Sequence, residues 1–254
     1  MNAHNRKNEI FELLTIYKKV SVNDLAKRFN VTTMTIRRDL NELETQGIVN
    51  LYYGGASLNE GNAIEKSFDL RESQESRIKY FIAYQASKYI NDGDTIYIDG
   101  GSTCYNICHF LKNKKITVLT NSLRTVNLLK NCEDVKVIIA PGEYSKVQEI
   151  VASYATIEFI SRYHLNKAFL STSGIDLDNG VSIATEMEAQ IKNKILQISD
   201  KKILLVDHTK FNQNFLVKHG MIDDFDIIIT DNKIDEDSKN KLTKHNIQLD
   251  IVNI

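Results

Sequence analysis

The sequence predicts an α+β protein of two domains, a winged helix-turn-helix over residues 1–57 and an α/β domain with a mostly parallel sheet over residues 76–254. The first observation behind this prediction is three short helical periodicities followed by a hairpin pattern near the N-terminus. The second is the alternation of short apolar runs with helical segments through the rest of the chain. The third is the length of 254 residues, which fits two domains of the usual ~100–200 residues. Residues 58–75 are polar with little periodicity, and we interpret them as a linker.

The elements of the first domain follow from apolar spacing and capping residues. In the first helix, apolar side chains recur at i, i+3, i+4 and i+7, namely Ile10, Leu13, Leu14 and Tyr17. Ser21 is a suitable N-cap for the second helix, with Asp24 in the capping-box position, and Thr32 is the expected N-cap of the third. Gly47 is the expected residue after the end of that helix. An alternating strand over residues 48–53 then stops at a pair of glycines.

The second domain begins with a predicted helix whose buried face consists of Ile78, Ile82, Ala86 and Ile90. Apolar runs then predict strands at residues 95–98, 116–119, 135–139, 168–170, 203–206 and 226–229. Such runs lack the polar alternation of a half-exposed strand, and helical segments separate them. Both features are typical of a parallel sheet that is covered on its two faces.

Composition excludes several other classes of protein. Lys and Arg total 32 and Asp and Glu total 33, so the net charge is −1, with +2 on residues 1–58 and −3 on the remainder. No apolar stretch is long enough for a signal sequence or a membrane span, so we expect a cytoplasmic protein. Three cysteines are too few for a disulfide scaffold. Cys104, Cys108 and His109 are close in sequence, but no second pair has ligand spacing, so we expect free thiols and neither a metal nor a cofactor.

The third helix carries the side chains best suited to DNA. Its apolar residues Ile36 and Leu40 face inward by spacing, which leaves outward Thr33, Met34, Thr35, Arg37 and Arg38. Arg binds guanine O6 and N7 bidentately, and Thr contacts thymine or phosphate. We therefore expect this helix to read double-stranded DNA, with Ser21 and Thr32 at helix starts beside phosphates. The alternative is a solvated polar face on a small helical domain.

Three segments of the first domain form an extended motif: Ser21-Val22-Asn23-Asp24-Leu25-Ala26, Met34-Thr35-Ile36-Arg37-Arg38-Asp39-Leu40 and Gly54-Gly55-Ala56. This motif resembles the helix-turn-helix of the DeoR family of bacterial transcription regulators, and the resemblance continues to about residue 231. It implies a repressor of sugar catabolism whose C-terminal domain senses a phosphorylated intermediate. The family usually has basic residues and a His before the two glycines, whereas Asn50, Tyr52 and Tyr53 stand here. We expect the two tyrosine hydroxyls to reach phosphates and the wing to contribute less affinity than is usual in the family.

Polar loops follow successive predicted strands of the second domain: Asp99-Gly100-Gly101-Ser102-Thr103, Thr120-Asn121-Ser122, Ala140-Pro141-Gly142, residues 171–176 and residues 207–211. Because parallel strands end at the same edge of a sheet, we expect these loops to converge on a ligand site. Glycines let backbone N–H groups approach an anion. Lys210 is suited to neutralise a phosphate, and Asp99 or Asp176 to accept sugar hydroxyls. For each loop the alternative is turn chemistry or a helix cap.

These loops also resemble the sensor domain of the same family, which shares the ribose-5-phosphate isomerase type of fold. The resemblance implies a sugar-phosphate pocket lined by Asp99, Gly100, Gly101, Ser102, Thr103, Thr120, Asn121, Ser122 and Lys210. It also implies that residues 186–192, including Glu188, lie at the pocket rim, and we add Gly142 of the third loop. The family often has two glycines where Ala140 and Pro141 stand, so we expect a different effector or a weaker one.

The functional prediction is a homodimeric or homotetrameric repressor that a phosphorylated sugar releases from its operator. The alternative class is a sugar-phosphate isomerase with an appended domain, in which Glu188 and Lys192 would supply the catalytic groups. Those isomerases carry an Asp-Gly-Ala-Asp-Glu loop, whereas the sequence here is Ser173-Gly174-Ile175-Asp176, which favours the regulator. A DNA-binding architectural protein without a ligand is a third class, against which the pocket-like loops argue.

Overall fold

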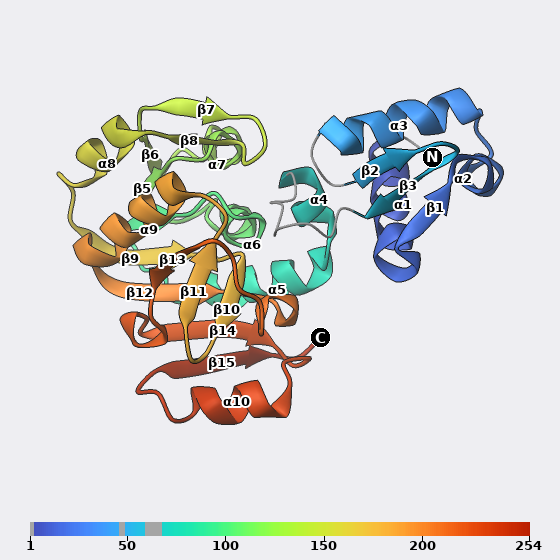
Figure 1. Ribbon diagram of the computed structural model, residues 1–254. Helices are drawn as coiled ribbons and strands as arrows, with labels where there is room; N and C mark the ends of the chain where they lie inside the picture. Colours follow the sequence, from blue (N-terminus) through green and yellow to red (C-terminus); the bar gives the residue numbers. More distant parts are fainter. Residues whose placement is uncertain (1–2, 46–48, 59–67) are drawn as a thin grey trace. The chain divides into compact units, whose positions relative to one another are not determined.

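The structure, a computed structural model, describes residues 3–45, 49–58 and 68–254 (Figure 1). Gly47, the residue expected to end the third helix, and Ile48, the first of the predicted wing strand, lie outside these residues. The chain divides into two compact units between Ser73 and Gln74. The predicted order of a winged helix-turn-helix followed by an α/β domain is confirmed.

The N-terminal unit has the element order of a winged helix. Its described elements are α1 (Ala3–Tyr17), β1 (Lys19–Ser21), α2 (Val22–Phe29), α3 (Thr33–Thr45), β2 (Val49–Tyr52), β3 (Gly55–Leu58) and α4 (Phe68–Ser73). The strands pair antiparallel in the order β1-β3-β2, and a two-residue turn joins β2 to β3 to form the wing. Two elements were not predicted: the short strand β1, and helix α4 within the segment that we interpreted as a linker.

The turn between α2 and α3 forms as the sequence predicts. Asn30 ends α2 in the left-handed region at φ 50°, which Asn tolerates better than most residues. Thr32 then caps α3, because its Oγ1 accepts a hydrogen bond from the Thr35 backbone N–H at 3.2 Å. The two helices are thereby joined tightly enough to act as a helix-turn-helix.

The predicted capping box at the start of α2 is wrong. Ser21 occupies the N-cap position, but its side chain makes no capping hydrogen bond, so the pairing with Asp24 does not form. Ser21 instead belongs to β1, where it pairs with Gly55 of the wing. The backbone N–H of Val22, in the first turn of α2, donates to the carbonyl oxygen of Gly54 at 2.9 Å. The wing thus supplies a partner at the start of α2 that the sequence pattern assigned to a side chain.

The core of the N-terminal unit joins its three main helices through Ile10, Leu14, Leu25, Ile36, Leu40 and Leu43. Tyr17, expected on the inward stripe of α1, is 68% exposed, and Phe11 is buried instead. An ion pair also links α1 to α3: Arg6 Nε donates to Asp39 Oδ2 at 2.5 Å and Nη2 to Oδ1 at 3.2 Å. Both side chains are buried, so this pair helps to set which face of α3 is turned outward.

The C-terminal unit alternates strands and helices. Its elements are α5 (Ser76–Ser87), β4 (Thr95–Ile98), α6 (Ser102–Tyr105), η1 (Asn106–Phe110), β5 (Ile116–Thr120), α7 (Leu123–Leu129), β6 (Val135–Ile139), β7 (Glu143–Ser145), β8 (Ile150–Ala152), α8 (Tyr154–Ile160), β9 (Leu165–Leu170), β10 (Gly174–Asp176), β11 (Gly180–Ile183), α9 (Glu186–Ile198), β12 (Ser199–Leu205), η2 (His208–Lys210), β13 (Val217–Gly220), η3 (Ile222–Asp224), β14 (Ile227–Asp231), α10 (Glu236–Leu242) and β15 (Gln248–Val252). The six predicted strands are β4, β5, β6, β9, β12 and β14.

The main sheet has seven strands in the order β15-β14-β12-β9-β4-β5-β6, and every neighbouring pair is parallel. Alternate residues of its strands enter two separate cores. Ile96 and Ile98 of β4 lie in the core with α5, whereas Tyr97 between them lies in the core with α9. The predicted face of the α5 segment is confirmed, since Ile78, Ile82, Ala86 and Ile90 are all buried. Helices therefore cover both faces of the sheet.

Three sets of strands were not predicted. β15 adds an edge to the main sheet, β7 and β8 form a hairpin, and β10, β11 and β13 form a small antiparallel sheet. These strands are short or only partly buried, so they lack the continuous apolar runs that revealed the central ones. Among the described helices, none has the length and apolarity that crossing a membrane requires.

Candidate functional site

The outer face of α3 presents the side chains predicted to read DNA. Thr33, Met34, Arg37 and Arg38 are exposed, with Met34 at 73%, while Thr35 is half-buried. Ile36 and Leu40 are buried, as their spacing predicts. Thr32 is exposed at the helix start, and Ser21 is half-buried in β1. The structure therefore leaves the polar face of α3 open to a partner.

The two wing tyrosines have different surroundings. The Tyr52 hydroxyl donates a hydrogen bond to the carbonyl oxygen of Val20 at 3.1 Å, so its proton is already used within the fold. Tyr53 lies in the turn between β2 and β3 and is fully exposed. Of the two, Tyr53 is the one whose hydroxyl is free to donate to phosphate in this conformation.

The C-terminal unit has a topological switch point between β4 and β9. From β4 the chain proceeds through β5 to β6 on one side, and it then returns to β9 on the other side and continues to β12, β14 and β15. Adjacent strands whose connections run in opposite directions leave a crevice at their carboxyl ends, where α/β proteins bind ligands. Asp99 follows β4 and Ser171 follows β9, so the fold places these two residues at that position.

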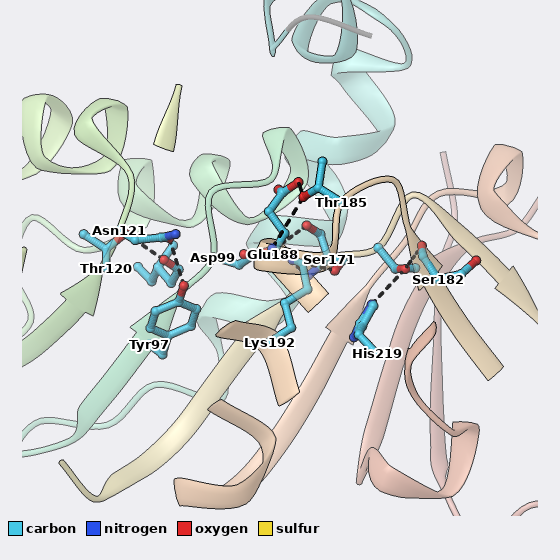
Figure 2. A network of polar contacts seen from close by, with 12 residues as sticks. Tyr97, Asp99, Thr120, Asn121, Ser171, Ser182, Thr185, Glu188, Lys192 and His219 are labelled. Carbon is cyan, nitrogen blue, oxygen red and sulfur yellow. Dashed lines mark hydrogen bonds and ion pairs between the residues drawn. The ribbon is translucent and has the colours of Figure 1, made fainter. Parts of the chain in front are cut away.

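Asp99 is the centre of a buried polar network at the switch point (Figure 2). Its Oδ2 accepts hydrogen bonds from the Ser171 backbone N–H at 3.1 Å and hydroxyl at 2.5 Å, and from Lys192 Nζ at 2.5 Å. Lys192 also donates to the Ser171 carbonyl oxygen at 3.0 Å. Burial would raise the pKa of Asp99, but Lys192 and Ser171 outweigh it and hold that pKa below its usual value. Among the described residues nothing donates to Oδ1, which leaves that oxygen available to a ligand.

The glycines of the first loop allow this packing. A Cβ on Gly101 would lie 1.9 Å from the Ser171 hydroxyl oxygen, and one on Gly100 would lie 2.1 Å from a methyl carbon of Ile150. Gly101 is also the N-cap of α6, so it supplies no side-chain cap to the first N–H groups of that helix. Ser102 and Thr103 are each only 5% exposed, and in the described part of the chain their hydroxyls make no hydrogen bond within the protein. These donors are suited to bind an anion or a polyol.

The second loop is engaged within the protein. Thr120 donates to the Ile98 carbonyl oxygen at 2.8 Å, and the Ser122 side chain caps α7. Asn121 Oδ1 accepts from the Tyr97 hydroxyl at 2.8 Å, and its Nδ2 donates to the Val151 carbonyl oxygen at 3.0 Å. All three side chains of the loop are buried. The Ser122 cap matches the alternative that we gave for each loop, turn chemistry or a helix cap, whereas Thr120 and Asn121 bind residues of other segments.

Glu188 and Lys192 lie one turn apart on α9, and both face the switch point (Figure 2). Glu188 Oε2 accepts a hydrogen bond from the Thr185 hydroxyl at 2.7 Å, and Thr185 is also the N-cap of α9. Glu188 is buried, so the rim position that the resemblance implied is an interior one. Lys192 was expected at that rim, or as a catalytic group in the isomerase alternative, and in the structure it is the cation that Asp99 binds.

His219 of β13 reaches the same region from the small antiparallel sheet (Figure 2). Its Nε2 lies 3.0 Å from the Thr172 Oγ1, whose own proton has the Ser182 carbonyl oxygen as an acceptor at 2.7 Å. The imidazole therefore donates through Nε2, and its buried Nδ1 has no partner among the described residues. Burial, and then the charge of Lys192, lower the pKa of His219 to about 3, so the ring is neutral.

The remaining predicted residues, Gly142, Asp176 and Lys210, make no hydrogen bond to the Asp99 network. Gly142, at φ +150°, packs on the start of α8, where a Cβ would lie 2.5 Å from the Thr156 hydroxyl oxygen. Asp176 Oδ1 accepts the backbone N–H groups of residues 178 and 179, and Oδ2 accepts from Asn214, which lower its pKa to about 2. Asp176 thus performs turn chemistry. Lys210 is half-buried on η2, and its charge helps to keep the pKa of the buried Asp207 low against the effect of burial.

Two of the three cysteines lie in the interior of the C-terminal unit. Cys104 and Cys108 are buried free thiols, and burial raises the pKa of Cys108 to about 12. Within the described residues no cluster of three or more potential ligands for a metal ion is present.

Sequence reasoning missed Tyr97 and His219. It placed Ser171 and Thr172 in a converging loop without naming a partner for either, and it gave Lys192 a chemical role only in the isomerase alternative. Tyr97 sits in an apolar strand and reads as core, which it also is. His219 follows a mixed segment, residues 212–218, that shows no regular alternation of apolar and polar residues. The spacing of Lys192 four residues after Glu188 was the one available signal, because it puts both side chains on one helical face.

These features define a two-domain transcription regulator, with a winged helix-turn-helix and an α/β domain whose polar loops meet at a switch point. Comparison with family models agrees: the DeoR-like helix-turn-helix domain matches residues 6–62, and the DeoR C terminal sensor domain matches residues 74–232. The chain belongs to the DeoR family.

Individual relatives extend over almost the whole chain. The glycerol-3-phosphate regulon repressor of Escherichia coli (strain K12) is 34% identical, covering 99% of this chain and 100% of its own length. The HTH-type transcriptional regulator IolR of Bacillus subtilis (strain 168) is 31% identical, covering 95% of this chain and 96% of its own. Among solved structures, ribose 5-phosphate isomerase A of Methanocaldococcus jannaschii is 16% identical, with 54% of this chain and 55% of that chain covered and a TM-score of 0.40.

Proposed function

We propose that this protein is a DNA-binding repressor of an operon for the uptake or catabolism of a sugar or sugar phosphate, and that a phosphorylated sugar releases it. Membership of the DeoR family and the name of the E. coli relative, a glycerol-3-phosphate regulon repressor, support this. The observation that supports binding of a phosphorylated sugar is the Asp99 network, a buried polar cluster at the switch point of a parallel sheet. The exposed polar face of α3 is the observation that supports DNA binding.

The effector is proposed to bind between the loop after β4 and the loop after β9. Asp99 Oδ1 accepts a sugar hydroxyl, since Oδ2 already receives Ser171 and Lys192. The hydroxyls of Ser102 and Thr103, with the N–H groups at the start of α6, donate to the ligand. Lys210 supplies positive charge for the phosphate from η2. The side chains of Thr120–Ser122 hold the loops in place rather than contacting the ligand.

Release from DNA requires that the effector bind two arrangements of the protein with different affinities. A homodimer or homotetramer supplies such arrangements, because the spacing of its recognition helices must match the operator half-sites. A single winged helix also buries too little surface for typical specific affinity, which favours pairing. We propose α5 and residues 56–75 as the segments that transmit the change, since they follow the winged helix in the chain. The proposed location is the cytoplasm, where such an operator resides.

The alternative is an isomerase, for which Glu188 and Lys192 would be the catalytic pair. An isomerase base must be free to take a proton from the substrate. Here Glu188 accepts the hydroxyl of its own N-cap residue, Thr185, and Lys192 is held by Asp99 and Ser171. These bonds support a role in holding the loops, so we propose that the protein has no catalytic activity. Aldose–ketose interconversion of a pentose or hexose phosphate by the purified protein would overturn this.

Footprinting of the purified protein on the DNA upstream of its own operon tests the proposal. The footprint is repeated with a panel of phosphorylated sugars and, as matched controls, the same sugars without phosphate. We expect a protected repeated or palindromic site that is lost with at least one phosphorylated sugar and kept with its unphosphorylated form. A protected site that no member of the panel alters would favour a ligand-free architectural protein.

A further inference from the structure

A groove of about 250 Å³ lies between the recognition helix α3 and the wing. Its helix side is lined by Arg37 and Asn41, which are four residues apart and therefore on one helical face. Its wing side is lined by Leu51, Tyr52, Tyr53, Gly54 and Gly55, and the buried Val22 and Leu40 also line it. This protein groove therefore lies between α3, which is suited to the major groove of DNA, and the wing, which is suited to the minor groove.

The wing side of this groove is held in a fixed position. The Tyr52 hydroxyl donates to the Val20 carbonyl oxygen at 3.1 Å, which links β2 to β1 across β3. A Cβ on Gly55 would lie 2.2 Å from that carbonyl oxygen and 2.6 Å from the Tyr52 hydroxyl oxygen, so only glycine leaves room for the bond. Tyr52 is therefore a positioning residue, and Tyr53 projects beyond it from the turn, fully exposed.

The charge of the groove is positive and comes from one side chain. Arg37 is the charged residue among those that line it, and none of the lining residues is acidic. Arg38 is exposed on α3 but is absent from the lining, because successive residues of a helix are rotated by about 100°. The two adjacent arginines therefore face different surroundings.

We infer that this groove seats one strand of the DNA sugar–phosphate backbone. The inference rests on the proposed function, in which α3 enters the major groove and the wing lies at the adjacent minor groove. A backbone strand separates those two grooves, so the surface between α3 and the wing meets it. Arg37 pairs with a phosphate, Tyr53 contacts the same strand through an uncharged ring and hydroxyl, and Arg38 is left for base edges.

The roles of the arginines differ in two measurable properties. A phosphate contact contributes to the salt dependence of binding but carries no sequence information, whereas a base contact carries that information. The test uses duplexes that the wild-type protein selects from a random library. On these duplexes, R37A should make the negative slope of log K against log salt shallower by about one, and the bases that it selects should be unchanged. R37K should keep the slope. R38A should instead lose base preference at one position of the selected site.

Tyr53 supplies the uncharged arm of the test. Y53A should weaken binding by the same factor at low and at high salt, and Y53F should recover the part that the ring contributes. Thermal unfolding of each variant checks that the fold is kept; Arg37 and Tyr53 are exposed, so we expect little change. If R37A alters base preference and leaves the slope unchanged, or if Y53A binds like the wild type, the inference is wrong. A wild-type protein that selects no sequence would instead reject the proposed function.

Discussion

Arg6 and Asp39 show how a single buried pair orients α3, the helix proposed to read DNA. The guanidinium binds the carboxylate through two nitrogen atoms, and both side chains are at most 5% exposed. Removing one partner leaves the other charge buried without compensation, which typically costs about 3–5 kcal/mol. We therefore predict that Asp39→Ala lowers the free energy of unfolding of the N-terminal unit by about 3 kcal/mol, measured by urea denaturation.

The control is the neighbouring pair of the same two helices, Lys7 and Glu42, which is partly exposed and has one contact at 2.8 Å. Exposed ion pairs contribute about 0–1 kcal/mol, so Glu42→Ala should change the unfolding free energy by less than about 1 kcal/mol. Equal effects of the two substitutions would mean that burial of the Arg6–Asp39 pair is not what makes it important.

A second single residue, His219, leads to a prediction about how the free energy of unfolding depends on pH. Its pKa is about 3 in the folded protein, against about 6.5 in an unfolded chain, so the unfolded state binds the extra proton first as pH falls. The contribution of neutral His219 to the free energy of unfolding is complete above about pH 6.5 and is lost progressively as the pH falls toward 3. At pH 5 the loss amounts to about 2 kcal/mol. We predict that His219→Gln shows a smaller fall in unfolding free energy between pH 7.5 and pH 5 than the wild type. Parallel curves for the two proteins would show that His219 is not kept neutral by folding.

The loop after β4 allows a prediction about a whole element. A Cβ on Gly101 would lie 1.9 Å from the Ser171 Oγ and 2.7 Å from its Cβ, so Gly101→Ala must displace Ser171 from Asp99. We predict that this variant still binds operator DNA but no longer responds to the effector, as measured by operator binding with and without the phosphorylated sugar. Gly93→Ala is the control, because it strains a turn at φ +88° with open space around it and should cost stability only. A Gly101→Ala protein with a normal effector response would remove this loop from the site.

At the scale of elements, the sequence predicts well what depends on local pattern. The ranges 95–98 and 135–139 agree with β4 and β6, and the Thr32 cap forms as expected. The errors arise where distant segments compete with local ones. Ser21 pairs with Gly55 of the wing and its side chain does not cap α2, and the unpredicted β15 pairs with β14 along the edge of the sheet.

The candidate site follows the same rule. The loops after β4 and β9 were predictable, since they follow apolar strands. The side chains that bind Asp99 could not be predicted, because the hydrogen bonds from Lys192 and Ser171 to Asp99 join residues 93 and 72 positions apart in the sequence. Asp176 was assigned to the pocket from its residue type, yet its side chain is used by its own turn and by Asn214.

For the whole molecule, charge limits how DNA is bound. Residues 1–58 carry a net charge of only +2, so a small number of phosphate contacts must supply the electrostatic affinity. We predict a shallow slope of log K against log salt for non-specific duplex DNA, corresponding to a few phosphate contacts per winged helix. Fluorescence anisotropy measures this slope between about 50 and 200 mM salt, a range over which proteins with many phosphate contacts lose much of their affinity. A slope near −10 would indicate a much larger cationic surface than the described residues provide.

The central claim is that one ligand, bound at the switch point of the C-terminal unit, changes how the N-terminal unit binds DNA. Lys210→Ala tests the phosphate role within it, and this variant should bind the operator normally and lose the effector response. The most direct measurement is the operator dissociation constant with and without the phosphorylated sugar, together with the dissociation constant of that sugar with and without operator DNA. Coupling of this kind predicts that each ligand weakens the other by the same factor, roughly 5–150-fold. Operator affinity that is unchanged while the sugar phosphate is demonstrably bound would contradict the account.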